Sequence, residues 1–254
     1  MTEVDVSNIL LKETHEHIIH LSNLPDAEFN KFFLLNPEFI HTDIVYERRC
    51  RRVFAPRLIP YRREMPWREF YYRITDLLPK LNSDIGNRLC RYNKIMELYI
   101  VIEIYGFFPD VNGANQLAEH GQLSVLEYLE KYSIYPNTKG ANAAAENAEL
   151  LVLDWLKNRN ILPTNYAIIT AIQAGNTAFL NWYGTLPEDI NACEIAIMNN
   201  NVVSLEYLFN NWYSLPQNYI ELAIQYQAHA VLHWFAAQIP AHTSTSITSE
   251  TTQN

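Results

Sequence analysis

The segment VIEIYGFFPDVNGAN (residues 101–115) is followed 27 residues later by a similar segment, YLEKYSIYPNTKGAN (residues 128–142). The shift aligns Pro109 with Pro136 and superposes the two GAN tripeptides. The same interval leads from Pro136 to Pro163 in a third copy. Sequence periods of about 20 to 50 residues are typical of proteins built from stacked supersecondary units. This repeat therefore predicts a fold of stacked units.

Each copy carries a leucine that is followed two residues later by an aromatic residue. The pairs are Leu126 and Tyr128, Leu153 and Trp155, Leu180 and Trp182, Leu205 and Tyr207, and Leu232 and Trp234, with the leucines 27, 27, 25 and 27 residues apart. Nine positions before each of these anchor leucines lies Leu117, Ala144, Ala171, Ala196 or Ala223. The pattern predicts five units, and a sixth, degraded unit is expected around residues 94–108. The anchor aromatics are expected to be mostly buried between units.

Each unit is predicted to form two short helices joined by a turn. In the first unit, GANQLAEH (residues 113–120) and LSVLEYLEKY (residues 123–132) place apolar residues at helical spacing, and Gly121 interrupts the chain between them. One unit cannot bury its apolar face alone, so neighbouring units must stack. The predicted fold class is all-α: an α-solenoid of helix-turn-helix repeats over residues 95–240, preceded by a helical module at residues 1–94.

The repeat cores AEHGQLSVLEYL, AAAENAELLVLDWL, AIQAGNTAFLNWY and AIMNNNVVSLEYLF resemble the ankyrin-repeat family, in the short, divergent form found in giant DNA viruses and their amoebal or algal hosts. The Thr-Pro-Leu-His start of that family is absent, and the period of 27 is shorter than its usual length. The resemblance implies a non-enzymatic module that binds a target protein. A structural or virion-associated protein is the alternative.

Two rows of positions on the first helix of each unit vary in polarity and are candidates for partner contacts. The first row is Asn115, Asn142, Ile169, Glu194 and Glu221, and the second is Glu119, Glu146, Gln173, Met198 and Gln225. In an ankyrin-like stack such positions line the concave face. The alternative for any single residue is ordinary solvated surface.

Residues 1–94 do not repeat. A Leu24-Pro25 dipeptide precedes a predicted helix that Asp26 is able to cap, and MPWREFYYRITDLLPKL (residues 65–81) predicts an amphipathic helix. The apolar face of the latter is Trp67, Phe70, Tyr71, Ile74 and Leu77.

This order of elements resembles the F-box-like N-termini that accompany ankyrin arrays. It implies docking on a Skp1-type adaptor of a cullin ubiquitin ligase, and hence a role as a substrate adaptor. The segment between Leu24 and the arginines is shorter than a full F-box, and no tryptophan stands where the box usually ends. A helical cap that closes the first repeat is the alternative.

The stretch ERRCRRVFAPRLIPYRRE (residues 47–64) has seven arginines and no lysine. We predict that Arg48, Arg49, Arg51 and Arg52 form the solvated side of a helix and a candidate docking edge, paired with carboxylates such as Glu47, Glu64, Glu69 or Asp76. Val45, Tyr46, Val53 and Phe54 are expected to pack inward. Nucleic-acid binding, with Tyr61, Tyr71 and Tyr72 as stacking faces, is less favoured because no nucleic-acid motif surrounds the run and the formal net charge is -9.

Charge is unevenly distributed along the chain. Residues 44–94 contain thirteen Lys or Arg against five Asp or Glu, whereas no Lys or Arg follows Arg159. The basic charge is thus predicted to belong to the N-terminal module and the acidic charge to the later repeats.

No residue is predicted to be catalytic, cofactor-binding or metal-binding. HEHIIH (residues 15–20) differs from the HExxH pattern, and no glycine-rich phosphate loop is present. Cys50 lies between arginines that lower a thiol pKa, but no Cys-His-Asn order accompanies it. Cys193 aligns with Ala114 and Ala141 and is expected to be a small core residue.

An intracellular, cytoplasmic location is predicted, in the host cytoplasm if the source is a virus. The N-terminal residues lack the basic and apolar regions of a signal peptide, and the apolar run IMELYIVIEIYGFF (residues 95–108) is too short to span a bilayer. The final AHTSTSITSETTQN (residues 241–254) is predicted to be a disordered tail because it is rich in Ser and Thr.

Overall fold

The computed structural model describes residues 21–35, 43–211 and 213–238, and within these residues it contains helices and no strand. The prediction of an all-α protein is confirmed. The chain divides into two compact units, residues 1–110 (unit 1) and 111–254 (unit 2). The predicted tail at 241–254 and the histidines at 15–20 lie outside the described residues.

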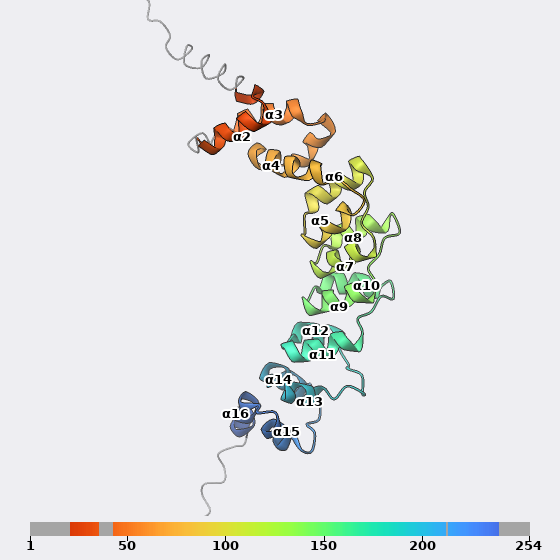
Figure 1. The fold of residues 1–254 in the computed structure, drawn as a ribbon. Helices are drawn as coiled ribbons and strands as arrows, with labels where there is room; N and C mark the ends of the chain where they lie inside the picture. The colour runs from red at the N-terminus through yellow and green to blue at the C-terminus, as the bar shows by residue number, and fades with distance from the viewer. Residues whose placement is uncertain (1–20, 36–42, 212, 239–254) are drawn as a thin grey trace, which may run out of the picture. The chain divides into compact units, whose positions relative to one another are not determined.

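Unit 1 is a set of short helices without an internal repeat in its first part (Figure 1). In chain order its elements are α2 (Asp26–Leu35), α3 (Asp43–Val53), η2 (Pro56–Arg62), α4 (Trp67–Leu77), η3 (Leu78–Lys80), α5 (Ile85–Arg91) and α6 (Ile95–Tyr105). Helix α3 packs against α4, and α6 contacts α4, α5 and η2.

Aromatic side chains form the core between α2, α3 and α4. All five residues of the predicted apolar face of α4 are buried, so that prediction is confirmed. The ring of Phe29 meets Tyr46 edge-on at 5.2 Å and Tyr71 at 5.4 Å, and Phe54 stacks on Tyr71 at 5.8 Å. Val53, which was expected to point inward, is 42% exposed, because Phe54 takes the inward position at the end of the helix.

Unit 2 consists of successive helix pairs (Figure 1). The helices are α7 (Val111–Glu119), α8 (Leu123–Glu130), α9 (Thr138–Glu146), α10 (Leu150–Lys157), α11 (Asn165–Ala174), α12 (Thr177–Tyr183), α13 (Ala192–Met198), α14 (Val202–Asn210), α15 (Tyr219–Gln225) and α16 (His229–Gln238). The first helices contact one another in order, from α7 through α9, α11 and α13 to α15. Each first helix also contacts the second helix of its own pair.

The turn inside each pair contains a residue in the left-handed region, always five positions before the anchor leucine. Gly121 and Gly175 adopt this conformation with no Cβ in the way, whereas Ala148, Asn200 and Gln227 adopt it at φ 52° to 56°. The turn geometry therefore repeats even where the glycine does not.

The same turn occurs once in unit 1, between α5 and α6. Asn93 has φ 52° and lies five positions before Leu98, which is fully buried. Leu98 thus occupies the anchor position of the expected sixth unit, and α5 supplies its first helix, upstream of residue 94. The predicted boundary between residues 94 and 95 falls inside this helix pair.

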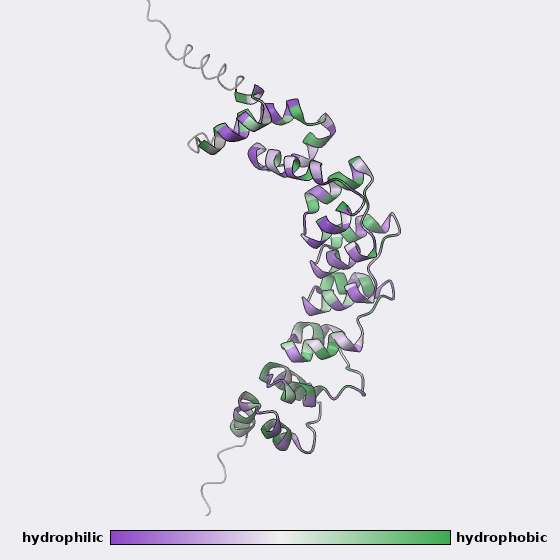
Figure 2. Ribbon diagram, in the orientation of Figure 1, coloured by the Kyte–Doolittle hydropathy of each residue, from purple (hydrophilic) through white to green (hydrophobic). Residues whose placement is uncertain are grey.

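Small residues lie between the first helices, whereas leucine is the most frequent buried residue of the second helices. Ala144, Ala171, Ala196 and Ala223 are at most 2% exposed, and Cys193 is buried as expected. Each helix of unit 2 carries hydrophobic and hydrophilic residues together, so that one side can be buried (Figure 2).

The anchor aromatics are less buried than expected. Among Tyr128, Trp155, Trp182, Tyr207 and Trp234, only Trp155 is buried, and the others are half-buried. Two of them make specific contacts: Trp182 Nε1 donates to Asp154 Oδ1 of the preceding repeat at 2.7 Å, and the Arg159 guanidinium of the same repeat stacks 4.0 Å above the Trp155 ring. Within the described residues, no helix is long and apolar enough to cross a membrane.

Candidate protein-interaction surface

The first row of predicted contact residues begins inside the stack. Asn115 is 8% exposed, and its Oδ1 accepts a hydrogen bond of 2.9 Å from the N–H of Asn137 in the next unit. Asn142 repeats this contact, since its Oδ1 accepts from the N–H of Thr164 at 2.8 Å and its Nδ2 donates to Thr164 Oγ1 at 3.0 Å. Both asparagines therefore join neighbouring repeats within unit 2.

Later members of the two rows come together in one open hollow of about 370 Å³ between α11 and α13. Ile169 belongs to α11, and Glu194 and Met198 belong to α13. The loop before α13 adds Asp189 and Ile190 to the lining. The hollow therefore combines carboxylates with aliphatic and thioether side chains, and three of the ten predicted contact residues share it.

The rest of the second row is mostly solvent-exposed. Glu146, Gln173 and Gln225 are exposed, and Met198 is 38% exposed. Glu119 is half-buried and accepts a hydrogen bond of 2.8 Å from Gln116 Nε2. In the first row, Glu221 is exposed on α15. These positions form the polar surface of the first helices.

Two further asparagines, which the sequence analysis did not predict, join neighbouring repeats of unit 2. Asn176 and Asn201 each cap their own second helix, because their Oδ1 atoms accept from the N–H groups of Phe179 and Ser204 at 3.1 and 3.0 Å. Their Nδ2 atoms donate to carbonyls at the end of the preceding first helix, Ala145 O and Gln173 O, at 2.8 and 2.9 Å. Each asparagine lies four residues before the anchor leucine of its repeat, Leu180 or Leu205, and this repeated position was the available signal.

The acidic groups around the hollow lack internal cations. Among the ion pairs of the described residues, none involves Asp189, Glu194 or Glu221. The last cations of the chain, Lys157 and Arg159, are engaged on the second-helix side: Lys157 lies 5.3 Å above Trp182, and Arg159 binds both carboxylate oxygens of Glu130. The first-helix surface around α13 is therefore negatively charged.

The predicted docking edge of arginines is wrong in one of its four members. Arg49 is 1% exposed: its Nη1 donates to the backbone carbonyls of Leu24 and Ser22, and its guanidinium lies 4.4 Å above the Phe29 ring. Helical phase explains this, because Arg49 lies four residues after Val45 and three after Tyr46, on the buried face.

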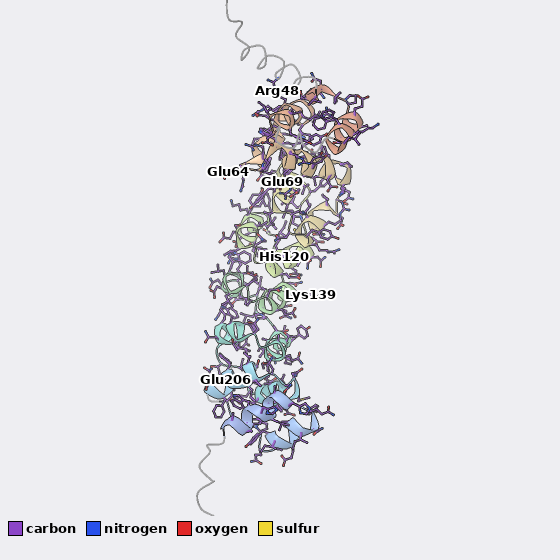
Figure 3. The ribbon with its side chains drawn as sticks, turned by 90° about the vertical axis from the view of Figure 1, so that its left-hand side faces the viewer. Arg48, Glu64, Glu69, His120, Lys139 and Glu206 are labelled. Carbon is purple, nitrogen blue, oxygen red and sulfur yellow. The ribbon has the colours of Figure 1, made fainter. Side chains whose placement is uncertain are left out.

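The other three arginines lie at or near the surface. Arg51 pairs with Glu47 at 2.9 Å, as one of the predicted carboxylate partners, and Arg52 Nη1 donates to Asn23 Oδ1 at 3.0 Å. Arg48, which is labelled in Figure 3, is half-buried. The two remaining predicted partners on α4 pair elsewhere, Glu69 with Arg73 and Asp76 with Lys80.

Most of the tyrosines predicted as possible stacking faces for bases already contact other parts of the protein. Tyr71 is buried in the aromatic core, and the Tyr61 hydroxyl donates to Glu103. Burial, with that hydrogen bond, raises the pKa of Tyr61 to about 12. Tyr72 is exposed and its hydroxyl lies 3.2 Å from that of Tyr46. Two of the three rings therefore face the protein itself.

The thiols are shielded. Burial raises the pKa of Cys50 to about 12, and the arginine next to it lowers that pKa by less than burial raises it. Burial also raises the pKa of Cys90 to about 12 and that of Cys193 to about 11. Arg49 and Arg62 lower the pKa of Cys50 as expected, but burial of the thiol, together with the nearby Asp43, raises that pKa by more. Within the described part of the chain, no group of three or more His, Cys, Asp or Glu residues could hold a metal ion.

Comparisons with known proteins found no match: no protein-family model matches the chain, and neither the curated proteins nor the solved structures include a significant relative. The ankyrin-like and F-box-like resemblances stay predictions from the repeat cores and the N-terminal element order. Support for a function comes from the geometry of the described residues.

Proposed function

We propose that this protein is a non-enzymatic protein-interaction module. In this proposal its helix pairs form a short-period, ankyrin-like solenoid. Unit 2 holds a basic, partly apolar segment of a target protein on its first helices. The supporting observation is the hollow between α11 and α13, where Ile169, Glu194 and Met198 from two successive units meet the acidic Asp189.

The chemistry of the hollow selects the charge of the target. Its carboxylates are not neutralised by ion pairs within the described residues, so a lysine or arginine from outside gains attraction without breaking an ion pair. Asp189 Oδ2 accepts one long hydrogen bond, of 3.4 Å, from Asn165 Nδ2. The aliphatic stem of such a side chain can lie along Ile169 and Met198. The hollow is open, which suits a side chain on an extended segment more than an enclosed small molecule.

Charge reversal tests the proposal. The full chain and the double variant Asp189→Lys, Glu194→Lys are used for affinity capture from the native cell, and captured proteins are then assayed singly in purified form. We expect the double variant to lose the target and the wild-type complex to weaken as salt rises, because exposed charges are screened. Glu206→Lys is the matched control, since Glu206 is exposed on α14 (Figure 3). Equal binding by both variants would contradict the proposal.

Recruitment of a Skp1-type adaptor through unit 1 stays a separate prediction from the sequence. Removing residues 1–45 is a poor test, because it deletes Phe29 and Val45 from the core of unit 1. Substitutions of exposed residues on α3, such as Arg51→Glu with Arg52→Glu, leave that core in place. The prediction would be supported if the adaptor co-purifies with the wild-type chain and these substitutions reduce that co-purification. A structural role without a ligase link is the alternative, and abundance in purified particles would favour it.

A further inference from the structure

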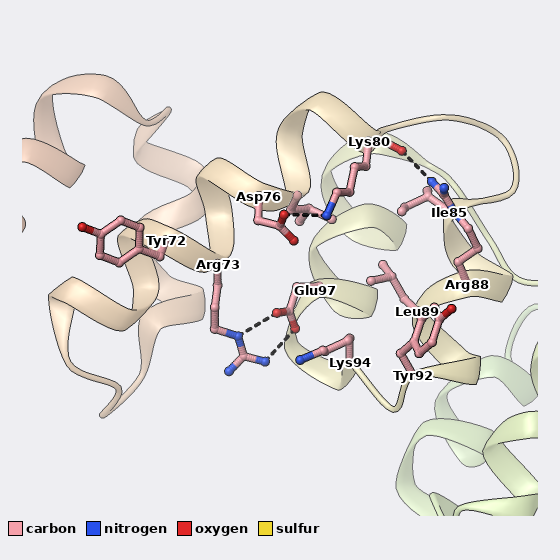
Figure 4. Close-up of a pocket in the computed structure, with 11 residues that line it drawn as sticks. Tyr72, Arg73, Asp76, Lys80, Ile85, Arg88, Leu89, Tyr92, Lys94 and Glu97 are labelled. Carbon is pink, nitrogen blue, oxygen red and sulfur yellow. Dashed lines mark hydrogen bonds and ion pairs between the residues drawn. The ribbon is translucent and has the colours of Figure 1, made fainter. Parts of the chain in front are cut away.

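Unit 1 contains a pocket that the sequence reading did not single out. It lies between the C-terminal half of α4 with η3 and the α5–α6 helix pair, and its volume is about 580 Å³ (Figure 4). That volume falls within the range of ordinary ligand pockets. All residues that line it belong to unit 1.

The floor of the pocket is aliphatic. Leu77, Ile85 and Leu89 are each mostly buried, and all three line the pocket. An apolar group that enters the pocket would displace water from this floor, which favours binding. The floor thus provides a place for one apolar side chain or an equivalent group.

The two acidic residues of the pocket are already neutralised. Glu97 receives two hydrogen bonds from Arg73, at 2.6 and 2.9 Å, and Asp76 pairs with Lys80 (Figure 4). The two hydrogen bonds that Arg73 donates to Glu97 raise the pKa of Arg73, as expected for a tight ion pair. A ligand cation would therefore have to break an existing pair.

Two cations keep unused donors. Arg88 Nη2 donates to the carbonyl of Lys80 at 2.9 Å, while its buried Nε has no hydrogen-bond acceptor within the described residues and lies 3.9 Å from Asp84. Lys94, which ends the turn before α6, has no ion-pair partner among those residues. Lys94 therefore has donors that no ion pair uses, Arg88 adds positive charge that only a long pair with Asp84 offsets, and the pocket has no spare carboxylate.

We propose that this pocket binds an acidic peptide segment of a protein partner, with one apolar side chain on the Leu77, Ile85 and Leu89 floor and a carboxylate at Lys94 and Arg88. This site differs from the hollow of unit 2 in position and in the sign of its charge. The protein then has two docking sites of opposite charge, a basic one on unit 1 and an acidic one on unit 2.

A peptide fits this pocket better than a nucleic acid does. Nucleic-acid binding depends on many phosphate contacts along a strand, with exposed aromatic rings for the bases. Here two available cations flank an aliphatic floor, and Tyr92 is the one strongly exposed ring among the residues that line the pocket. One carboxylate next to one apolar side chain matches what the pocket offers.

Binding is measured by fluorescence anisotropy with the full chain and two fluorescein-labelled peptide pools. Both pools carry a central Leu or Phe; the flanking positions are Asp and Glu in one pool and Asn and Gln in the other. We expect the acidic pool to bind about tenfold more tightly, because each carboxylate gains a charge-assisted hydrogen bond. Replacing the central residue by Ser should weaken the acidic pool by about tenfold, since the floor then stays unfilled.

Lys94→Glu should weaken binding of the acidic pool by about tenfold or more. Lys31→Glu is the matched control, because Lys31 is an exposed lysine on α2 of the same unit. Equal affinity of the two pools, or equal losses in the two variants, would overturn the proposal. The proposal would also be overturned if the acidic peptides do not bind, but a single-stranded oligothymidylate does bind and Lys94→Glu abolishes that binding. The Asp189→Lys, Glu194→Lys variant should bind the acidic pool as the wild type does, so this test and that of the proposed function fail separately.

Discussion

Unit 1 and the repeats of unit 2 are both built from short helices, but they hold those helices together with different side chains. In unit 1, large aromatic rings surround one buried guanidinium, that of Arg49. In unit 2, small residues bring the first helices together, and asparagine side chains bond one pair to the next. A non-repeating core depends on a few large residues, whereas a repeating one spreads its contacts over equivalent small ones. Substitutions should therefore be costly at single places in unit 1 and moderate at several places in unit 2.

The largest effect is expected at Arg49. Arg49→Met should destabilise the protein by about 3 kcal/mol, because it leaves the carbonyls of Leu24 and Ser22 without this buried donor. Urea unfolding gives the free energy, and hydrogen exchange should locate the loss in unit 1. Arg52→Met, which removes an exposed bond to Asn23, should cost less than about 1 kcal/mol. If the two variants are equally stable, the buried guanidinium does not hold unit 1 together.

A second effect is expected where the first helices of unit 2 meet. Ala196→Leu should cost about 2 kcal/mol, because Ala196 is fully buried and the added carbons must push neighbouring helices apart. Ala178→Leu on α12 makes the same change at an exposed position and should be nearly neutral. Thermal unfolding of the two variants measures the difference. An unchanged melting temperature for Ala196→Leu would show that close approach of the first helices is not required.

A smaller effect is expected at Asn201, where the two functions of one amide can be separated. Asn201→Ala should cost about 1 to 2 kcal/mol, since it removes both the cap of α14 and the bond to Gln173. Asn201→Asp keeps the capping oxygen but lacks the Nδ2 donor, and it should fall between the alanine variant and the wild type. Asn158→Ala, at an exposed position after α10, is the control. A stability of Asn201→Asp below that of Asn201→Ala would argue against a capping role.

The smallest effect at neutral pH concerns the thiols, which lie in both units. Burial raises their pKa values above the ordinary value of 9.0, to about 12 for Cys50 and Cys90 and about 11 for Cys193. The folded protein therefore keeps these protons between about pH 9 and those values, while the unfolded chain releases them. Stability should be unaffected below about pH 9 and should fall as pH rises through that window. Slow iodoacetamide labelling of the folded protein at about pH 8, and rapid labelling in urea, would agree with burial; rapid labelling without urea would not.

Some sequence predictions that depended on periodicity are confirmed, although the anchor aromatics are less buried than their repeated position predicted. The apolar face of α4 is an example, as is the burial of Cys193, because a spacing of three to four residues places side chains on one side of a helix whatever the surroundings. Arg49 was predicted wrongly because its charge was weighed above its helical phase. The phase alone, four residues after Val45, indicated the buried face.

The candidate sites were predictable only in part. The repeat register selected Ile169, Glu194 and Met198, which line one hollow, but it also selected Asn115, whose side chain bonds to the next unit. Nothing in the register distinguishes the two cases, because the distance to the neighbouring unit determines whether an asparagine reaches a backbone N–H. The pocket of unit 1 had no sequence signal, since its lining comes from α4, η3, α5, the following turn and α6.

Residue types and their spacing were enough to predict that this chain is helical, that its repeats follow one another at a near-constant interval, and that most of its Lys and Arg residues precede residue 95. These properties depend on residue type and spacing along the chain. The folded structure was needed to show which arginine is buried, which asparagines join neighbouring repeats, and which charges lack an internal ion pair. Those properties depend on distances between segments remote in sequence, and hydrogen bonds and ion pairs form only when folding brings their atoms within a few ångströms.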